Sequence, residues 1–247
     1  MNREGQAENT EQAAIEVCSV SKAFGPRLVL RGVRLVVRRS EGVCLCGVNG
    51  AGKSTLLRII AGLLCPDTGT VRLNGHDARA EAAKTKPQLG VIGHKSMVYP
   101  ELTVWENLSF FARLYGVSDR AARVTGFLEK LGLARYRYDK AGVLSRGLLQ
   151  RLAIARALVH GPRVLLADEP FTGLDLEACR YLVSVFTDFR NEGGAIVMTT
   201  HDISVGLECC DRVAVLDSRA VIFDSTTDKI DKSAFLMDYL SYARSSD

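Results

Sequence analysis

The sequence predicts an α/β fold with a mostly parallel central sheet, an antiparallel β subdomain and an inserted helical subdomain. Three observations support this class. A glycine-rich loop at residues 47–55 stands between an apolar run at 42–46 and an amphipathic run at 54–62, as in a strand–loop–helix unit. Further short apolar runs separated by helical patterns are typical of strands buried on both faces of a parallel sheet. A long helical pattern interrupts these runs between residues 94 and 157.

The antiparallel part is expected near the start of the chain. Residues 15–20 and 28–37 alternate apolar side chains with polar or branched ones, which predicts paired strands. Residues 70–75 end in Asn-Gly, the dipeptide that favours a tight hairpin turn. We therefore expect a further hairpin strand there.

The helical part has an identifiable start. Thr103 and Glu106 have the spacing of a capping box, which satisfies free N–H groups at a helix N-terminus. A second helix is expected over 148–159, after a serine that can cap it. The strands expected to form the parallel sheet after this region are 163–167, 195–199 and 212–216.

The predicted organisation is one domain with short ends. Residues 1–12 are polar and are expected to form a disordered tail. Residues 13–226 form the domain, with the helical subdomain inserted at about 94–157, and 227–247 form a short C-terminal tail.

Composition excludes several classes of function. Of the 247 residues, 47% are apolar and 24% charged, and the net charge of +4 is too small to indicate nucleic-acid binding. No run reaches 18 apolar residues, and the start lacks the order of a signal peptide, so neither a membrane span nor secretion is expected. The seven cysteines form no C-x-x-C pair, which favours reduced thiols of a cytosolic protein over a metal site.

The loop at 47–55 matches the phosphate-binding pattern G-x-x-x-x-G-K-[ST]. Glycine allows the backbone N–H groups to converge on an anion, and the following helix adds its dipole. Lys53 supplies a positive charge for the β and γ oxygens of a nucleotide, and the Ser54 hydroxyl can ligate Mg²⁺. The alternative is a glycine-rich turn that binds nothing.

Two carboxylates follow the expected strand at 163–167. Asp168 can hold Mg²⁺ through water, and Glu169 can act as the general base that activates a water molecule. Paired acids at a strand end can also cap a helix, and the phosphate-binding loop makes the catalytic interpretation the better one.

Two further polar groups are candidates. His201 follows the expected strand at 195–199 and can contact the γ-phosphate, although a single histidine after a strand is usually a surface residue. Ser145 and Gly147 begin the helix expected over 148–159. They can form a second anion site, or Ser145 can be a simple N-cap.

Together these motifs resemble the ATP-binding-cassette (ABC) ATPases, a group of P-loop NTPases, over residues 15–225. Residues 47–55 resemble the Walker A loop, 164–169 the Walker B strand, 144–150 the signature motif and 172–175 the D-loop. His201 occupies the position of the switch histidine in this family.

The resemblance implies ATP and Mg²⁺ as cofactors and a defined set of site residues. The implied catalytic residues are Glu169, His201, Lys53 and His94, and the implied metal ligands are Ser54 and Asp168. The implied nucleotide-binding residues are Phe24 (stacked on adenine), Gly47, Val48, Asn49, Gly50, Ala51, Gly52, Lys53, Ser54, Thr55, Ser145, Gly147 and Asp175.

The resemblance also implies partners. In this family each ATP lies between the phosphate loop of one subunit and the signature motif of another, so we expect a homodimer in which Ser145 and Gly147 act in trans. A separate membrane permease is the second expected partner, contacted through residues 94–115 at the cytoplasmic face of the membrane.

The chain departs from the family pattern at three positions. Arg146 replaces a glycine and Leu148 a glutamine of the signature, and His94 replaces the usual glutamine of the Q-loop. Gly93 and His94, with the helix that follows, resemble the haem-exporter ATPases of cytochrome c maturation, so haem export is the expected function. The alternatives are another exporter, of drugs, lipids or polysaccharides, or a soluble ABC protein of assembly or repair.

Overall fold

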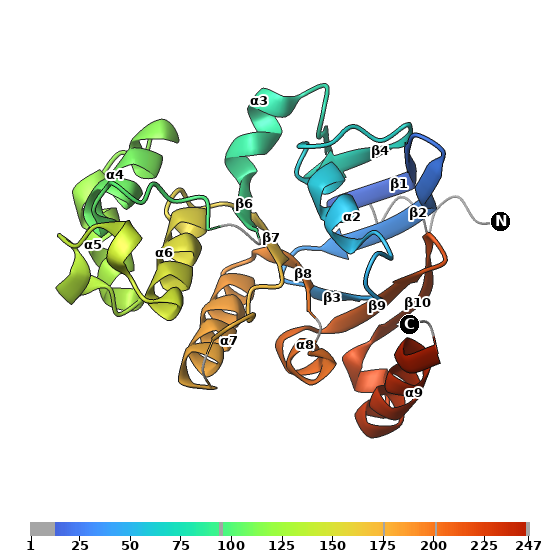
Figure 1. Ribbon diagram of the computed structural model, residues 1–247. Coiled ribbons are helices and arrows are strands. Elements are labelled where there is room, and N and C mark those ends of the chain that lie inside the picture. Colours follow the sequence, from blue (N-terminus) through green and yellow to red (C-terminus); the bar gives the residue numbers. More distant parts are fainter. Residues whose placement is uncertain (1–12, 94–95, 175, 201, 246–247) are drawn as a thin grey trace.

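The computed structural model describes residues 13–93, 96–174, 176–200 and 202–245, arranged as Figure 1 shows. In chain order the elements are β1 (Ala13–Phe24), β2 (Arg27–Arg38), β3 (Gly42–Cys46), α2 (Lys53–Ile60), β4 (Thr68–Leu73), β5 (His76–Asp77), α3 (Ala82–Thr85), β6 (Leu89–Ile92), α4 (Val104–Leu114), α5 (Arg120–Lys130), α6 (Arg146–Leu158), β7 (Val164–Asp168), α7 (Leu176–Asn191), β8 (Ala195–Thr199), α8 (Ile203–Cys209), β9 (Arg212–Asp217), β10 (Ala220–Thr226) and α9 (Lys232–Ser245).

The strands form two sheets that confirm the predicted fold class. The larger sheet has the order β10-β9-β3-β8-β7-β6 and is parallel except for the β9–β10 hairpin. The smaller sheet, β2-β1-β4-β5, is antiparallel throughout. The Asn-Gly turn lies at the predicted hairpin between β4 and β5, with Asn74 at φ 47° and Gly75 at φ 82°.

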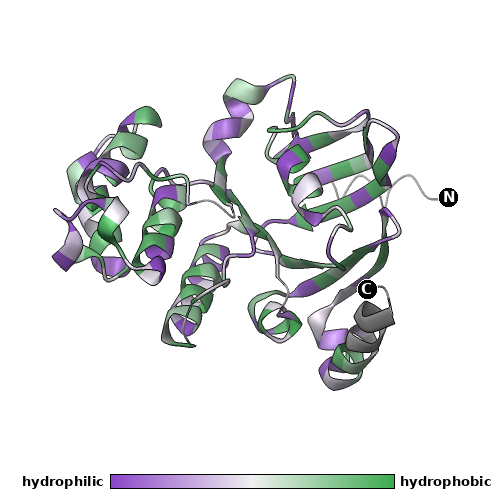
Figure 2. Ribbon diagram, in the orientation of Figure 1, coloured by the Kyte–Doolittle hydropathy of each residue, from purple (hydrophilic) through white to green (hydrophobic). Residues whose placement is uncertain are grey.

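Each central strand contributes side chains to two hydrophobic cores. In β3, Val43 and Leu45 face the core shared with the antiparallel sheet and α2, whereas Cys44 and Cys46 face the core shared with the helices. The same alternation holds in β7, β8 and β9. Successive side chains of a strand point to opposite faces, so strands covered on both sides are apolar throughout. Figure 2 shows this continuous apolar character in the central sheet.

The helices between β6 and β7 form a separate lobe beside the sheets (Figure 1). The predicted capping box begins α4: the Thr103 side chain accepts from the Glu106 N–H, and the Glu106 carboxylate accepts from the Thr103 N–H. Val104 and Leu108 of α4 pack with Val124 of α5 in the core that extends from the main sheet. Leu152 and Ile154 of α6 belong to the same core, so α6 packs both with this lobe and with the main sheet.

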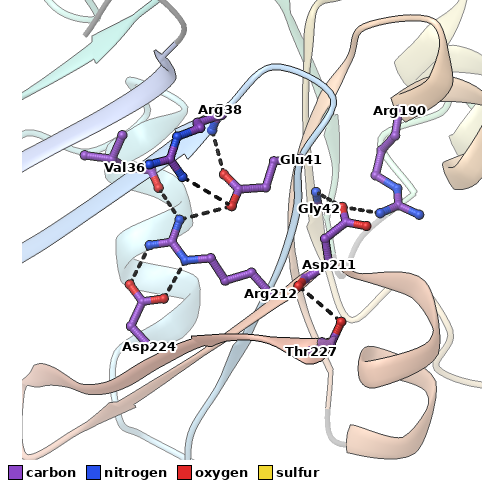
Figure 3. Close-up of polar contacts among 9 residues, drawn as sticks. All are labelled: Val36, Arg38, Glu41, Gly42, Arg190, Asp211, Arg212, Asp224 and Thr227. Atoms are coloured by element: carbon purple, nitrogen blue, oxygen red, sulfur yellow. Dashed lines mark hydrogen bonds and ion pairs between the residues drawn. The ribbon is translucent and has the colours of Figure 1, made fainter. Parts of the chain in front are cut away.

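A network of charges joins the two sheets at the amino end of β3 (Figure 3). The Arg212 guanidinium donates two 2.5 Å bonds to Asp224, one to Glu41 and one to the Val36 carbonyl. Nearby, the Gly42 N–H donates to Asp211. The pKa of Arg212 is raised, first by its hydrogen bonds to Asp224. This network holds the β2–β3 turn against β9 and β10.

The segment 227–247, expected only as a tail, contains a regular element in the structure. Helix α9 follows β10 and lies beside it (Figure 1). Asp231 precedes the helix and accepts hydrogen bonds from the N–H groups of Ser233 and Ala234. In the part of the chain that the structure describes, no helix combines the length and apolarity needed to cross a bilayer.

Candidate active site

Residues 47–52 connect β3 to α2 at the carboxyl edge of the main sheet, and the rest of the predicted loop, 53–55, forms the first turn of α2. Gly52 is the N-cap of α2 and has φ 107°, a conformation that favours glycine. A Cβ atom at this position would lie 2.8 Å from the Leu30 side chain, so close packing also requires glycine here. Gly52 offers no side-chain acceptor to the first turn of the helix. The N-terminal N–H groups of α2 can therefore face an anion.

Lys53 is buried within this loop, with 7% of its surface exposed. Its Nζ atom donates to two backbone carbonyls, Gly47 O at 2.7 Å and Val48 O at 3.1 Å. Burial lowers the pKa of Lys53, and the nearby negative charges of Glu169 and Asp168 oppose that shift. The result is a cation held by neutral oxygens at the centre of a loop suited to phosphate.

Asp168 joins the loop to two neighbouring strands. Its Oδ1 atom accepts a hydrogen bond of 3.1 Å from the Ser54 hydroxyl and one of 2.7 Å from the Thr199 hydroxyl. Strand pairing brings these groups together, because Asp168 at the end of β7 lies opposite Thr199 at the end of β8. The Ser54 hydroxyl and the Asp168 carboxylate thus converge at the place where the sequence predicts a Mg²⁺ site. Oxygen ligands of this kind suit Mg²⁺.

Glu169 has an unusual backbone conformation for its residue type, with φ 55°. Its N–H donates to the hydroxyl (3.0 Å) and carbonyl (3.2 Å) oxygens of Thr199, and its carboxylate accepts from the Thr172 hydroxyl at 3.3 Å. Left-handed backbone at a non-glycine residue costs energy and persists where the surrounding contacts enforce it, often at functional sites. These contacts fix the backbone of Glu169 beside Thr199 and hold its carboxylate within reach of Thr172.

A cleft of about 430 Å³ lies over the loop. One wall is the tip of the β1–β2 hairpin, where Phe24 and Arg27 face each other across the turn. Phe24 is half exposed, and the Lys22 ammonium lies 5.6 Å from the centre of its ring. The other lining residues are Val29, Asn49, Gly50, Gly52, Lys53, Ser54, Thr55 and Glu169. The structure thus places an aromatic ring, a phosphate-type loop and the candidate base around one cavity.

The signature residues lie elsewhere, at the start of α6. Ser145 is the N-cap of this helix and accepts from the Leu148 N–H at 3.4 Å. Arg146 lies against the backbone of Gly173, where a Cβ atom would be 2.3 Å from the guanidinium carbon. Gln150 donates to the Pro170 carbonyl at 2.8 Å and so joins α6 to the loop after Glu169. Neither Ser145 nor Gly147 lines the cleft of its own chain.

The other residues expected in the site divide into two groups. Gly47 and Val48 hold Lys53 through their carbonyls rather than lining the cleft, and Ala51 does not line it either. His94, Asp175 and His201 lie outside the described residues.

Sequence reasoning missed several residues of this site, among them Thr199 and Arg27. Thr199 binds Asp168, but only the strand order places it there. Arg27 lines the cleft and lies 3.7 Å from the position of a Cβ atom on Gly50. The hairpin turn that follows Phe24 could have indicated Arg27, because the two residues pair across it.

The sequence is similar to known proteins along most of its length. The family model described as "ABC transporter" matches residues 30–172. The Nod factor export ATP-binding protein I of Burkholderia orbicola is 38% identical over 83% of this chain and 68% of that protein. Two proteins of Bacillus subtilis align over 83% of this chain. They are the ABC transporter ATP-binding protein NatA (34% identical, 84% of its length) and the linearmycin resistance ATP-binding protein LnrL (32%, 66% of its length).

Solved structures also share this fold. An ATP-binding subunit of an ABC transporter superposes with a TM-score of 0.84 and 31% identity, covering 93% of this chain and 98% of that one. A dimeric structure of the ATP-binding cassette MJ0796, bound to ADP and Pi, superposes with a TM-score of 0.78 and 28% identity, covering 86% and 98%.

Proposed function

Because this chain belongs to the ABC transporter family of ATP-binding proteins, we propose that it is the ATP-hydrolysing subunit that drives a membrane transporter. The observation that carries the proposal is the position of Asp168. Its carboxylate contacts Ser54 of the phosphate loop and Thr199 of the neighbouring strand, and it directly precedes Glu169. The Asp168 carboxylate therefore lies next to the residues that we assign to the binding of phosphate, Mg²⁺ and the attacking water.

Each residue has a distinct task in this mechanism. The Lys53 ammonium and the loop N–H groups bind the phosphate oxygens of ATP. Ser54 and Asp168 would hold Mg²⁺, which neutralises charge on the β and γ oxygens when it is bound. The Glu169 carboxylate accepts a proton from the water that attacks the terminal phosphorus, and ADP leaves. Phe24 stacks on the adenine ring.

The proposed working unit is a dimer. Ser145 and Gly147 do not line the cleft of their own chain, so the same helix end is available to a nucleotide on a second copy. The related cassette MJ0796, described as dimeric with ADP and Pi, supports this arrangement by analogy. Asp175 and His201, which lie outside the described residues, are assigned to this composite site by their place in the family motifs.

A permease is the proposed membrane partner. The helical lobe and the segment before it carry exposed apolar side chains: Met97, Tyr99, Phe110 and Leu114. The Tyr99 and Phe110 rings meet edge to face with centroids 5.3 Å apart, so these two side chains form one exposed apolar patch. Exposed apolar patches of this kind mark protein contacts. We assign this surface to a permease at the cytoplasmic face of the cell membrane.

The direction of transport is proposed to be export. Two of the named relatives are a Nod factor export protein and a linearmycin resistance protein, which favours a transporter that removes a small molecule from the cell. Haem export for cytochrome c maturation is the second candidate, and the resemblance of Gly93, His94 and the helix that follows favours it. The names of these relatives do not support haem as cargo. Co-purification of the membrane partner from native membranes distinguishes the two candidates, because the permease determines the cargo.

Replacement of Glu169 tests the hydrolytic mechanism. We expect Glu169→Gln to lower steady-state ATP hydrolysis more than 100-fold, because the amide cannot accept the proton of the attacking water. The variant should still bind ATP and accumulate as ATP-bound dimers, visible by size-exclusion chromatography. The matched control is Glu129→Gln, which changes an exposed carboxylate on α5. Hydrolysis by Glu169→Gln at the wild-type rate would refute Glu169 as the base.

A further inference from the structure

The C-terminal helix reaches the first glycine of the phosphate loop. The Tyr239 hydroxyl of α9 accepts a hydrogen bond of 3.0 Å from the Gly47 N–H, across 192 positions of sequence. The bond is partly buried. None of the sequence motifs predicts this contact, and the mechanism proposed above does not use it.

Helix α9 is attached to the rest of the domain on two sides. The Phe235 ring packs on Phe223 of β10 with centroids 5.3 Å apart, and on Tyr239 within α9 at 6.3 Å. The Lys232 ammonium donates to the Leu207 carbonyl of α8 at 3.2 Å. Aromatic pairs at these distances are attractive, so the ring of Tyr239 is held by a stack that begins on the main sheet.

Gly47 occupies a position that tolerates little displacement. The pairing of β3 with β9 ends at Cys46 and Val215, and the chain turns into the loop at the next residue. Gly47 has φ 152°, and a Cβ atom there would lie 2.3 Å from the Leu216 carbonyl. The peptide is therefore confined beside β9. Its N–H points to Tyr239 instead of continuing the ladder of the sheet.

The same glycine also positions the catalytic cation. Its carbonyl accepts the 2.7 Å bond from Lys53 Nζ, while its N–H donates to Tyr239. Two polar groups on one residue thus connect α9 to the ammonium that faces phosphate. A buried N–H left without a partner costs more than an ordinary hydrogen bond contributes, so loss of the Tyr239 hydroxyl would favour other loop conformations.

We propose that Tyr239 is a positioning residue of the nucleotide site, which fixes Gly47 and through it Lys53, so that α9 forms part of the ATP-binding machinery. The inference rests on the proposed ATP site. It predicts that the hydroxyl, rather than the bulk of the ring, sets nucleotide affinity. Because the loop contacts phosphate before and during the reaction, the effect should fall more on KM than on kcat.

The test is Mg²⁺–ADP binding to the full-length chain by isothermal titration calorimetry. We expect Tyr239→Phe to raise the Kd about three- to tenfold, the range for loss of one hydrogen bond. Amide hydrogen exchange at Gly47, followed by NMR, should become faster in the same variant. The control is Tyr181→Phe on α7, whose buried hydroxyl has no hydrogen-bond partner among the described residues and whose removal should leave the Kd unchanged.

The experiment distinguishes failure of the proposed ATP site from failure of the role assigned to Tyr239. If wild-type protein fails to bind ADP, the proposed ATP site is wrong. If wild type binds but Tyr239→Phe binds equally well, or loses no more than Tyr181→Phe, the role of Tyr239 is refuted. Should Tyr239→Phe not fold, Phe235→Leu replaces it, because this change keeps the hydroxyl but weakens the stack behind it. Weaker ADP binding then supports the inference, and unchanged binding overturns it.

Discussion

At its amino end, strand β3 begins beside a network in which positive and negative side chains face one another, whereas at its carboxyl end it continues into a loop around Lys53. The Arg212 side chain, 14% exposed, is held by Asp224 and by Glu41, which is 11% exposed. Within the described part of the chain, the ammonium of Lys53 hydrogen-bonds to carbonyl oxygens instead. The two ends belong to a single strand of five residues.

The difference gives one end of the strand a structural network and the other end the proposed phosphate-binding cation. A buried charge that is paired and hydrogen-bonded is compensated within the protein. Removal of one partner leaves the other charge buried and uncompensated, which lowers the stability of the fold. A buried charge held only by neutral oxygens keeps most of its field available to an incoming anion. The lowered pKa of Lys53 and the raised pKa of Arg212 express the same contrast.

The largest expected effect is on ligand binding at the carboxyl end. Lys53→Met keeps most of the buried stem and removes the charge. We expect ATP hydrolysis to fall at least 100-fold, because the phosphate oxygens lose a preorganised cation. The free energy of unfolding should change by less than about 1 kcal/mol, since burial already disfavours the ammonium. Steady-state hydrolysis and urea unfolding measure the two quantities. A large loss of stability in Lys53→Met would contradict the view that Lys53 serves ligand binding and not the stability of the fold.

At the amino end, the matched change is Arg212→Met. It leaves Glu41 and Asp224 without their shared cation, and we expect the free energy of unfolding to fall by about 2–3 kcal/mol. In a chain of this size that corresponds to a fall of roughly 4–12 °C in Tm. The Kd for Mg²⁺–ADP should remain within twofold of wild type. Stability equal to wild type in urea would show that this network contributes nothing.

The smallest expected effect comes from the residue that supports Asp168. Thr199→Val preserves shape but removes the hydroxyl that donates to Asp168 and accepts from the Glu169 N–H. We expect kcat to fall about three- to tenfold, as loss of one or two ordinary hydrogen bonds implies. Thr187→Val on α7 serves as the control, because its hydroxyl donates to the Val183 carbonyl of its own helix. Equal rates for the two variants would exclude a role for Thr199.

The sequence alone predicted the position of those features that are formed by contiguous residues. The phosphate loop, the ends of β7 and β8 and the capping box at Thr103 are contiguous patterns, and local geometry determines them. The fold class follows from the same patterns. The roles of His94, Asp175 and His201 stay predictions, because they lie outside the described residues.

Contacts between segments that are distant along the chain could not be predicted from the sequence. Thr199 meets Asp168 because β8 lies between β3 and β7, and the order of strands in a sheet is not written in any one segment. Tyr239 meets Gly47 because α9 folds back beside β10, although residues 227–247 carry no motif. The pairing of Arg212 with Glu41 has the same cause.

The most direct test of the contrast is the shift in Tm that saturating Mg²⁺–ADP produces in wild type, Lys53→Met and Arg212→Met. A ligand that binds only the folded state raises Tm according to its affinity. We predict that Arg212→Met unfolds at a lower temperature than wild type but gains the same shift. Lys53→Met should unfold near the wild-type temperature and gain almost none. A normal shift in Lys53→Met, or a lost shift in Arg212→Met, would contradict the assignment of the two ends of β3.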